Sequence, residues 1–192
     1  DDAVGEAFDK TSKILNLGYP GGPSIEKFAK LGDKNSYRLP EPIINRAGCN
    51  LSLSGLKTDI LRKSKNIKHD KEKYDLAASF QETINKILRK KTELAMNIFR
   101  EEVSDNSKKT FVVAGGVAAN KTIRENLKEL CIRKNFKPIF PSMEFCGDNA
   151  AMIAWAGIQR YKKKLFKKVN VVRSRWPLDK SAPFLKGPGL KL

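Results

Sequence analysis

Apolar residues recur at spacings of three, four and seven over residues 75–100, the period that gathers them on one face of an α-helix. We therefore expect a long amphipathic helix there, with this face packed in a core. The opposite face is basic, and it is either solvated or in contact with phosphate groups. The apolar positions are Leu76, Phe80, Ile84, Ile87, Leu88, Leu94, Ala95 and Ile98, and the basic positions are Lys86, Arg89, Lys90 and Lys91.

Two shorter helices are predicted near the N-terminus, on either side of a turn rich in glycine and proline. The first covers about residues 7–15, and Ser24 is expected to cap the second, which runs to about Leu31. The turn, residues 18–23, reads Gly-Tyr-Pro-Gly-Gly-Pro. Tandem glycines let a backbone approach a ligand closely, and prolines stiffen the loop. The turn is therefore either an ordinary interhelical connection or a ligand-binding loop.

The segment before the long helix combines a polar alternation with a lysine-rich stretch. The alternation Leu-Ser-Leu-Ser at residues 51–54, followed by Gly55, predicts a strand or hairpin. Residues 59–73 are rich in lysine and contain His69, the only histidine of the chain. Because charged residues surround it, we expect His69 to occupy a solvated loop rather than to act as a catalytic base.

A strand, a glycine pair, a helix and a second strand follow one another after residue 109. Residues 110–114 predict a buried strand, Gly115 and Gly116 a turn, and residues 137–140 a second strand. The intervening helix is apolar at Ile123, Leu127 and Leu130. This order predicts a βαβ crossover, and with it an α/β lobe with a largely parallel sheet.

Two candidate ligand positions follow these predicted strands. Ligands of α/β proteins collect beyond the carboxyl ends of parallel strands, and helix N-termini favour anions. The glycine pair at 115–116 meets both conditions, although it also suits tight packing of a strand against a helix. Asp148 precedes a helix predicted over residues 147–160, where it either caps the helix or binds a metal ion near phosphates.

Composition favours a polyanionic partner. Lysine and arginine number 38 against 21 aspartates and glutamates, a formal net charge of +17. Such a charge attracts nucleic acid, although a lysine-rich composition of the source organism would also produce it. Three widely spaced cysteines, Cys49, Cys131 and Cys146, fit neither a disulfide framework nor a zinc cluster, so we expect reduced thiols.

The start of the chain, its apolar stretches and its last residues each bear on what kind of protein it is. We expect a fragment, because Asp1 opens within a motif and no methionine precedes it. No stretch is apolar for the roughly 20 residues that cross a bilayer, and no secretion signal begins the chain, so we expect a cytoplasmic protein without membrane contact. Residues 179–192 lack periodicity and predict a loose basic tail.

Five ordered segments resemble the C-terminal half of the tRNA N6-adenosine threonylcarbamoyltransferase family, formerly described as O-sialoglycoprotein endopeptidases or glycoproteases. The resemblance covers about residues 1–178, with a βαβ core at about 108–163. The segments are Asp-Asp-Ala-Val-Gly-Glu-Ala-Phe-Asp-Lys at 1–10, Tyr-Pro-Gly-Gly-Pro at 19–23, Ser-Gly-Leu-Lys-Thr at 54–58, Ala-Gly-Gly-Val-Ala-Ala-Asn at 114–120 and Gly-Asp-Asn-Ala-Ala-Met-Ile-Ala-Trp at 147–155.

The resemblance implies a fold, a reaction and a set of binding residues. The fold is the actin-like ATPase (ribonuclease H-like) fold, here its C-terminal lobe with a helical insertion. The reaction transfers threonylcarbamoyl from threonylcarbamoyl-AMP to N6 of adenosine 37 in tRNAs that read codons beginning with A. By resemblance, Asp9, Gly22 and Asn120 bind this substrate or its nucleotide, and Asp148 ligates an iron or zinc ion. Glu26 is a weaker ligand candidate.

The same resemblance implies partner molecules and indicates what the chain lacks for activity on its own. Relatives work with tRNA, with a paralogue of the same fold and with a small ATPase. The His-x-x-x-His metal motif of the family's N-terminal lobe has no counterpart here, so the other metal ligands must come from that lobe, and we expect the isolated chain to be inactive. The alternative is a noncatalytic nucleotide-binding interaction module. A peptidase is disfavoured, because no Ser/His/Asp or Cys/His set is present.

Overall fold

The computed structural model describes residues 3–103 and 107–165, and the chain divides into two compact units, Asp1–Asp148 and Asn149–Leu192. The predicted tail at 179–192 and the end of the predicted lobe at 166–178 lie outside the described residues.

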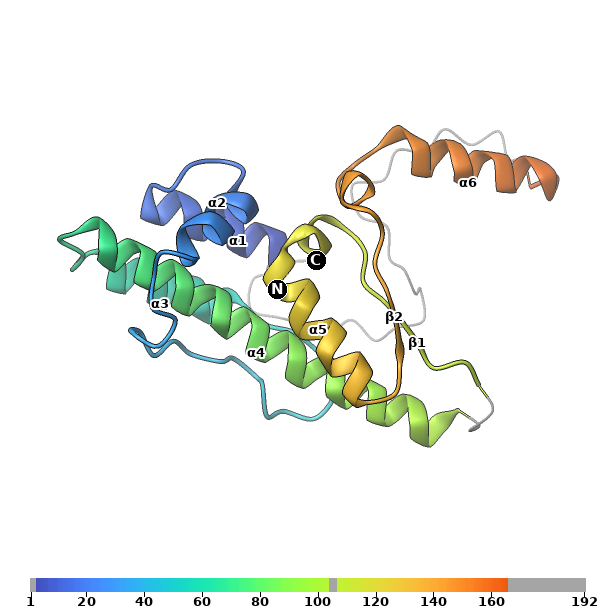
Figure 1. Cartoon of the computed structure of the whole chain (residues 1–192), viewed down its shortest axis with the longest axis horizontal. Coiled ribbons are helices and arrows are strands. Elements are labelled where there is room, and N and C mark those ends of the chain that lie inside the picture. Colours follow the sequence, from blue (N-terminus) through green and yellow to red (C-terminus); the bar gives the residue numbers. More distant parts are fainter. Residues whose placement is uncertain (1–2, 104–106, 166–192) are drawn as a thin grey trace, which may run out of the picture. The chain divides into compact units, whose positions relative to one another are not determined.

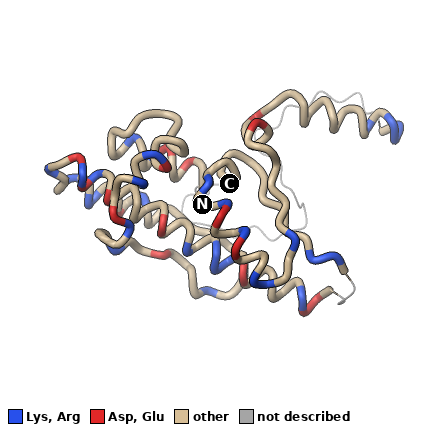
Figure 2. Tube along the Cα trace, viewed as in Figure 1, with Lys and Arg blue, Asp and Glu red and all other residues tan. Residues whose placement is uncertain are grey.

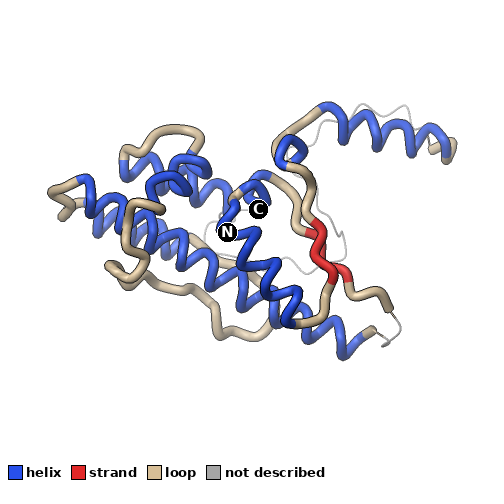
Figure 3. The backbone as a smooth tube through the Cα atoms, in the orientation of Figure 1, coloured by secondary structure: helices blue, strands red, loops and turns tan. Residues whose placement is uncertain are grey.

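The first unit is mainly helical, with one small parallel sheet (Figures 1 and 3). Helices and strands alternate only in its second half, where the predicted βαβ unit lies. The elements are α1 (Val4–Leu15), α2 (Gly21–Ala29), α3 (Ser54–Ser64), α4 (Asp70–Glu102), β1 (Thr110–Val112), the short 3-10 helix η1 (Gly116–Ala119), α5 (Lys121–Arg133), β2 (Lys137–Ile139) and the short 3-10 helix η2 (Met143–Phe145).

The core forms around α4, against which α1, α2, α3 and α5 pack. Leu76, Phe80, Ile84 and Ile87 are buried as the apolar period predicts, and the ring of Phe80 meets Phe8 of α1 edge to face with centroids 5.0 Å apart. The prediction was less accurate towards the end of the helix. Leu94, Ala95 and Ile98 are only half-buried there, and the buried side chain is that of Met96.

Helix α4 begins five residues before the predicted start at residue 75. Its N-cap is His69, and the Glu72 carboxylate accepts hydrogen bonds from the backbone N–H groups of Lys68 (2.6 Å) and His69 (3.1 Å). These backbone bonds hold the pKa of Glu72 below its ordinary value. The side chain of His69 is exposed, in keeping with the solvated position predicted for it, although it lies at a helix start.

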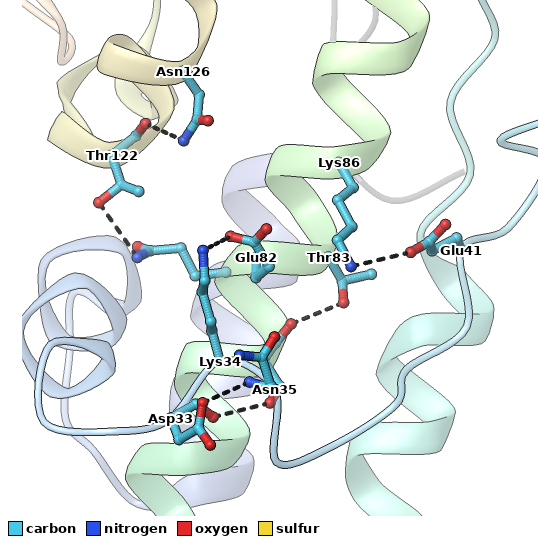
Figure 4. A network of polar contacts seen from close by, with 11 residues as sticks. Asp33, Lys34, Asn35, Glu41, Glu82, Thr83, Lys86, Thr122 and Asn126 are labelled. Atoms are coloured by element: carbon cyan, nitrogen blue, oxygen red, sulfur yellow. Dashed lines mark hydrogen bonds and ion pairs between the residues drawn. The ribbon is translucent and has the colours of Figure 1, made fainter.

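One residue of the predicted basic face is not at the surface. Lys91 is only 4% exposed, and its ammonium donates to the carbonyl oxygens of Arg46 (2.7 Å) and Gly48 (3.0 Å). It therefore anchors the loop of residues 37–53 to α4, and its prediction as a solvated or phosphate-binding lysine was wrong. Lys86 does reach the surface, where it pairs with Glu41 at 3.9 Å (Figure 4).

The strand predicted at residues 51–54 is absent from this described part of the chain. Residues 51–53 are loop, and Ser54 begins α3 instead. Leu53, Leu56 and Ile60 are buried at helical spacing, so this longer apolar pattern outweighs the short Leu-Ser alternation.

Helix α2 begins at Gly21, three residues before the predicted cap. Ser24 lies within the first turn, where its hydroxyl donates to the Pro20 carbonyl at 3.0 Å. Pro23 is tolerated there because the first turn of a helix needs no N–H from it. The predicted turn of residues 18–23 therefore includes the start of a helix.

Gly21 lies where the backbones of α1 and α2 almost touch. A Cβ atom at this position would come within 2.4 Å of the Asp9 Cα and 2.6 Å of the Phe8 carbonyl oxygen. The next residue differs, because a Cβ atom at Gly22 would meet nothing within 4 Å. Only the first glycine of the pair is thus required by the packing of the two helices.

The predicted βαβ unit is confirmed. Strands β1 and β2 are parallel, in the register Thr110 to Lys137, Phe111 to Pro138 and Val112 to Ile139, and α5 connects them. Burial of the strands is less than predicted, since Val112 is 60% exposed and Ile139 is 42% exposed. The described residues are therefore helix-rich with a small two-stranded parallel sheet, a form of α/β organisation.

The end of α5 is tied to α4 by charge. Glu93 of α4 lies 2.7 Å from the Lys134 ammonium and 3.7 Å from the Arg133 guanidinium. The hydrogen bond from Lys134 and the nearby positive charges lower the pKa of Glu93, although partial burial opposes them. More generally, lysine and arginine are interspersed with acidic residues along these helices (Figure 2).

The second unit contains helix α6 (Ala150–Lys162). Its N-cap is Asn149, whose side-chain oxygen accepts the Met152 N–H at 2.9 Å. The helix thus starts three residues after the predicted position, and the structure does not support Asp148 as its cap. Its apolar side chains, among them Trp155 and Ile158, are exposed.

The three cysteines are free thiols, as predicted. Cys131 and Cys146 are buried and Cys49 is exposed, and burial raises the pKa of the Cys131 thiol. None of the described helices combines the length and the apolar character that crossing a bilayer demands.

The adjacent glycines allow a matched test of the α1–α2 contact. We expect Gly21→Ala to lower the free energy of unfolding by about 2 kcal/mol or more, because the added methyl group must displace backbone. Gly22→Ala should leave it unchanged or raise it by about 0.5 kcal/mol, since alanine restricts the unfolded chain. Urea unfolding of both variants measures the difference, and equal stabilities would contradict the close approach of the two helices at Gly21.

The lowered pKa of Glu93 predicts how stability depends on pH. A carboxyl whose folded pKa lies below its ordinary value of 4.5 stabilises the fold above that value and loses this contribution as the pH falls through the folded pKa. Glu93→Gln should therefore lower the melting temperature at pH 7 and reduce its drop between pH 7 and pH 3. Glu129→Gln removes an exposed carboxylate of α5 and is the control. The same pH dependence in both variants would refute the assignment.

Candidate functional site

A cavity of about 550 Å³ lies in the first unit between α1, α2, η1 and the start of α5. It has a suitable size for a small organic ligand. Its walls are partly apolar, with glycine backbone and three polar side chains. The lining residues are Gly5, Phe8, Asp9, Gly22, Pro23, Glu26, Gly116, Val117, Ala119, Asn120 and Met143.

Asp9 enters this cavity from the middle of α1. One of its carboxylate oxygens accepts the backbone N–H of Gly21 at 2.7 Å and so caps α2 from a neighbouring helix. This bond and the close approach at Gly21 place the following residue, Gly22, on the cavity wall. Among the described residues, no hydrogen-bond acceptor takes up the Gly22 N–H, so this donor remains for a ligand.

Glu26 connects the two helices whose N-termini meet at the cavity. Its carboxylate accepts the backbone N–H of Lys121, the first residue of α5, at 2.9 Å. Both α2 and α5 thus start at this site, and the carboxylates of Asp9 and Glu26 meet the positive ends of their dipoles. Gly115, with φ 91°, provides the bend that leads β1 into η1 and α5.

Asn120 is the N-cap of α5. Its side-chain oxygen accepts the Ile123 N–H at 3.0 Å, and its side-chain nitrogen donates to Gln81 of α4 at 2.9 Å. Asn120 is only 7% exposed, yet it lines the cavity. The residue therefore closes the helix end and presents an amide to any bound ligand.

The structure brings three of the four predicted site residues together. Asp9, Gly22 and Asn120, which come from three separate segments, line the same cavity. Asp148 is not among the lining residues, and its side chain is exposed. Within residues 3–103 and 107–165, no group of three histidine, cysteine, aspartate or glutamate side chains could hold a metal ion.

Sequence reasoning missed Gln81, Phe8 and Met143. Gln81 was detectable in principle, because it is a polar residue beside Phe80 within the apolar stripe of the long helix, where burial requires a hydrogen-bond partner. Phe8 and Met143 carried no such signal. Apolar residues of this kind look like ordinary core residues until the fold places them at a cavity.

Comparisons with known proteins identify the family to which the chain is similar. A family model described as tRNA N6-adenosine threonylcarbamoyltransferase matches residues 1–155. A tRNA N6-adenosine threonylcarbamoyltransferase of Pelagibacter ubique is 56% identical over 193 residues, which cover 100% of this chain and 54% of that protein. The corresponding protein of Rickettsia massiliae is 49% identical over 182 residues, which cover 93% of this chain and 53% of that protein.

The chain spans about half the length of these curated relatives. Its match to the family model nevertheless extends through all the residues that line the cavity. On this identity and this coverage, the chain belongs to the tRNA N6-adenosine threonylcarbamoyltransferase family.

Proposed function

We propose that this chain forms the nucleotide-binding part of an enzyme that transfers threonylcarbamoyl from threonylcarbamoyl-AMP to N6 of adenosine 37 in tRNAs reading codons that begin with A. In this proposal the chain is the C-terminal lobe of an actin-like ATPase fold. The observation that carries it is the cavity, where Asp9, Gly22 and Asn120 converge in a chain of this family.

The cavity has the groups that an adenylate requires. The unbonded Gly22 N–H at the start of α2 is a donor for one of the phosphate oxygens. The second carboxylate oxygen of Asp9 is suited to accept a hydroxyl group, and the apolar side chains of Phe8 and Val117 suit a base.

The chemistry that we assign to this chain is binding and polarisation. The amine of the tRNA adenosine attacks the carbamoyl carbonyl carbon and gives up one proton to solvent, and AMP leaves with the electrons of the broken C–O bond. The Gly22 N–H at the start of α2 would donate to the AMP phosphate and help to stabilise the negative charge that develops on it. The formal charge of +17 favours approach of the polyanionic tRNA.

An iron or zinc ion would polarise the carbonyl in such a reaction. The described residues do not fit a complete metal site, since Asp148 is a single carboxylate without companion ligands there. We propose Asp148 as one ligand and assign the others to histidines in the part of the relatives that this chain does not span. No step of the reaction is derived through the metal.

By resemblance we propose a cytoplasmic complex with a paralogue of the same fold and a small ATPase. The alternative, a noncatalytic nucleotide-binding module, is favoured by one observation: the nucleotide cavity is present within the described residues, whereas Asp148 has no companion ligands there.

A chimera separates these possibilities. We expect the purified 192-residue chain to leave a tRNA transcript unmodified when threonylcarbamoyl-AMP is supplied. A chimera in which this chain replaces the matching half of the Pelagibacter ubique relative should form threonylcarbamoyladenosine, measured by mass spectrometry of tRNA digests. The Pelagibacter ubique protein itself is the positive control. A folded but inactive chimera would support the noncatalytic module, and an active isolated chain would refute our view that the other half is needed.

Gly22 tests the nucleotide site within the chimera. We expect Gly22→Ala to weaken AMP binding about tenfold, because its methyl group enters the cavity beside the free N–H, while the melting temperature stays unchanged. Ser24→Ala alters the same turn of α2 outside the cavity and should bind AMP normally. Isothermal titration calorimetry measures both. Unchanged affinity of the Gly22 variant would count against the proposed site.

A further inference from the structure

Gln81 is a buried polar residue of α4, as are Ser79, Thr83 and Asn85. It is 7% exposed, and its neighbours Ala77, Ala78 and Phe80 are buried apolar residues. A buried amide without hydrogen bonds costs free energy, so the position demands partners. Gln81 finds them at the start of α5, where it accepts from Asn120 at 2.9 Å and approaches the hydroxyl of Thr122 at 3.5 Å.

The backbone N–H of Ile123 determines which atom of each side-chain amide donates and which accepts. The Ile123 N–H can only donate, so the Asn120 side chain must turn its oxygen towards it, at 3.0 Å. The Asn120 nitrogen then faces Gln81, whose oxygen must accept. The Gln81 nitrogen is left to donate to the Thr122 hydroxyl. No other orientation of the two amides satisfies all three contacts.

Figure 4 shows the outer end of this network. Thr122 of α5 lies on the side of that helix that faces α4, and the Thr122 carbonyl accepts the side-chain N–H of Asn126 at 2.9 Å. Gln81 is thus held by two residues at the α5 start, on the side of α4 that faces α5. It does not line the cavity itself.

We propose that Gln81 is a positioning residue, which fixes the Asn120 amide so that its second N–H is directed to an acceptor atom of the nucleotide. The Asn120 nitrogen carries two hydrogens, and Gln81 uses one of them. Without Gln81 this amide could rotate or exchange its oxygen and nitrogen, and the donor at the cavity would be lost part of the time. The inference rests on the proposed nucleotide site.

Two substitutions of Gln81 distinguish a role in positioning the Asn120 amide from a role in the stability of the fold. Gln81→Met keeps the length of the side chain but removes the acceptor. Gln81→Glu keeps an acceptor for Asn120 at the expense of a buried charge, which lowers the melting temperature. If Gln81 positions Asn120, AMP affinity in the chimera falls about three- to tenfold for the Met variant, the loss of one hydrogen bond, and stays within about twofold for the Glu variant.

A double-mutant cycle identifies Asn120 as the residue through which Gln81 acts. In the Asn120→Ala background, Gln81→Met should have no further effect on AMP affinity, because the amide that it orients is gone. Asn126→Ala, a change in the same network that does not reach Asn120, is the control and should bind AMP normally. Titration calorimetry with AMP and thermal unfolding of each variant provide the two readouts.

The outcomes are distinct. An unchanged AMP affinity in Gln81→Met, a weakening of equal size in the presence and absence of Asn120, or a Glu variant as weak as the Met variant would overturn the positioning role. If Asn120→Ala and Gly22→Ala both bind AMP as tightly as the unaltered chimera, the proposed nucleotide site is overturned instead, and the positioning role falls with it.

Discussion

The structure depends on the burial of one face of α4. Its apolar side chains meet α1, α2, α3 and α5, so a single helix organises most of the first unit. Each fully buried large side chain on it, such as Phe80 or Ile84, contributes about 1.5–3 kcal/mol of transfer free energy. Because α1, α2 and α5 share this support, the residues that they carry are held in fixed relation to one another. The cavity is a consequence of that arrangement.

Polar side chains add hydrogen bonds between helices that apolar packing has already brought together. Carboxylates of one helix cap the start of another, Asp9 at Gly21 and Glu26 at Lys121, and these bonds join α1 to α2 and α2 to α5. A side-chain amide of α4, that of Gln81, performs the same task for Asn120. Each of these polar contacts lies at or next to the cavity wall. The site is therefore built from helix ends whose first N–H groups are bonded to side chains of neighbouring elements, while the Gly22 N–H is left for a ligand.

The net charge of the chain acts over a longer range than these contacts, and it does not show which basic residues would meet RNA. The net charge of +17 favours a polyanion such as tRNA, but several basic side chains already have structural partners. Lys91 holds a loop through two carbonyl groups, and Lys134 holds the end of α5 to Glu93. A count of lysines thus overstates the charge that is free to meet RNA.

The amino-acid sequence by itself determined the long helix, the βαβ unit and the family, because each has a signal in the order of residues: the apolar period of residues 75–100, the strand, glycine pair and helix after residue 109, and five ordered segments. Helix starts were less predictable. Ser24 was expected as a cap and Asp148 as either a cap or a metal ligand, yet α2 starts at Gly21, capped from α1, and α6 is capped by Asn149. Only the tertiary structure decided which distant residues share a site. Asp9, Gly22 and Asn120 were named separately by resemblance, and nothing in their spacing shows that they line one cavity. The burial of Lys91 and the identity of Asn120 as the partner of Gln81 were likewise not readable from the sequence. The physical reason is that local patterns report the period and caps of one element, whereas a cavity and its polar partners form only when elements far apart in the chain pack together.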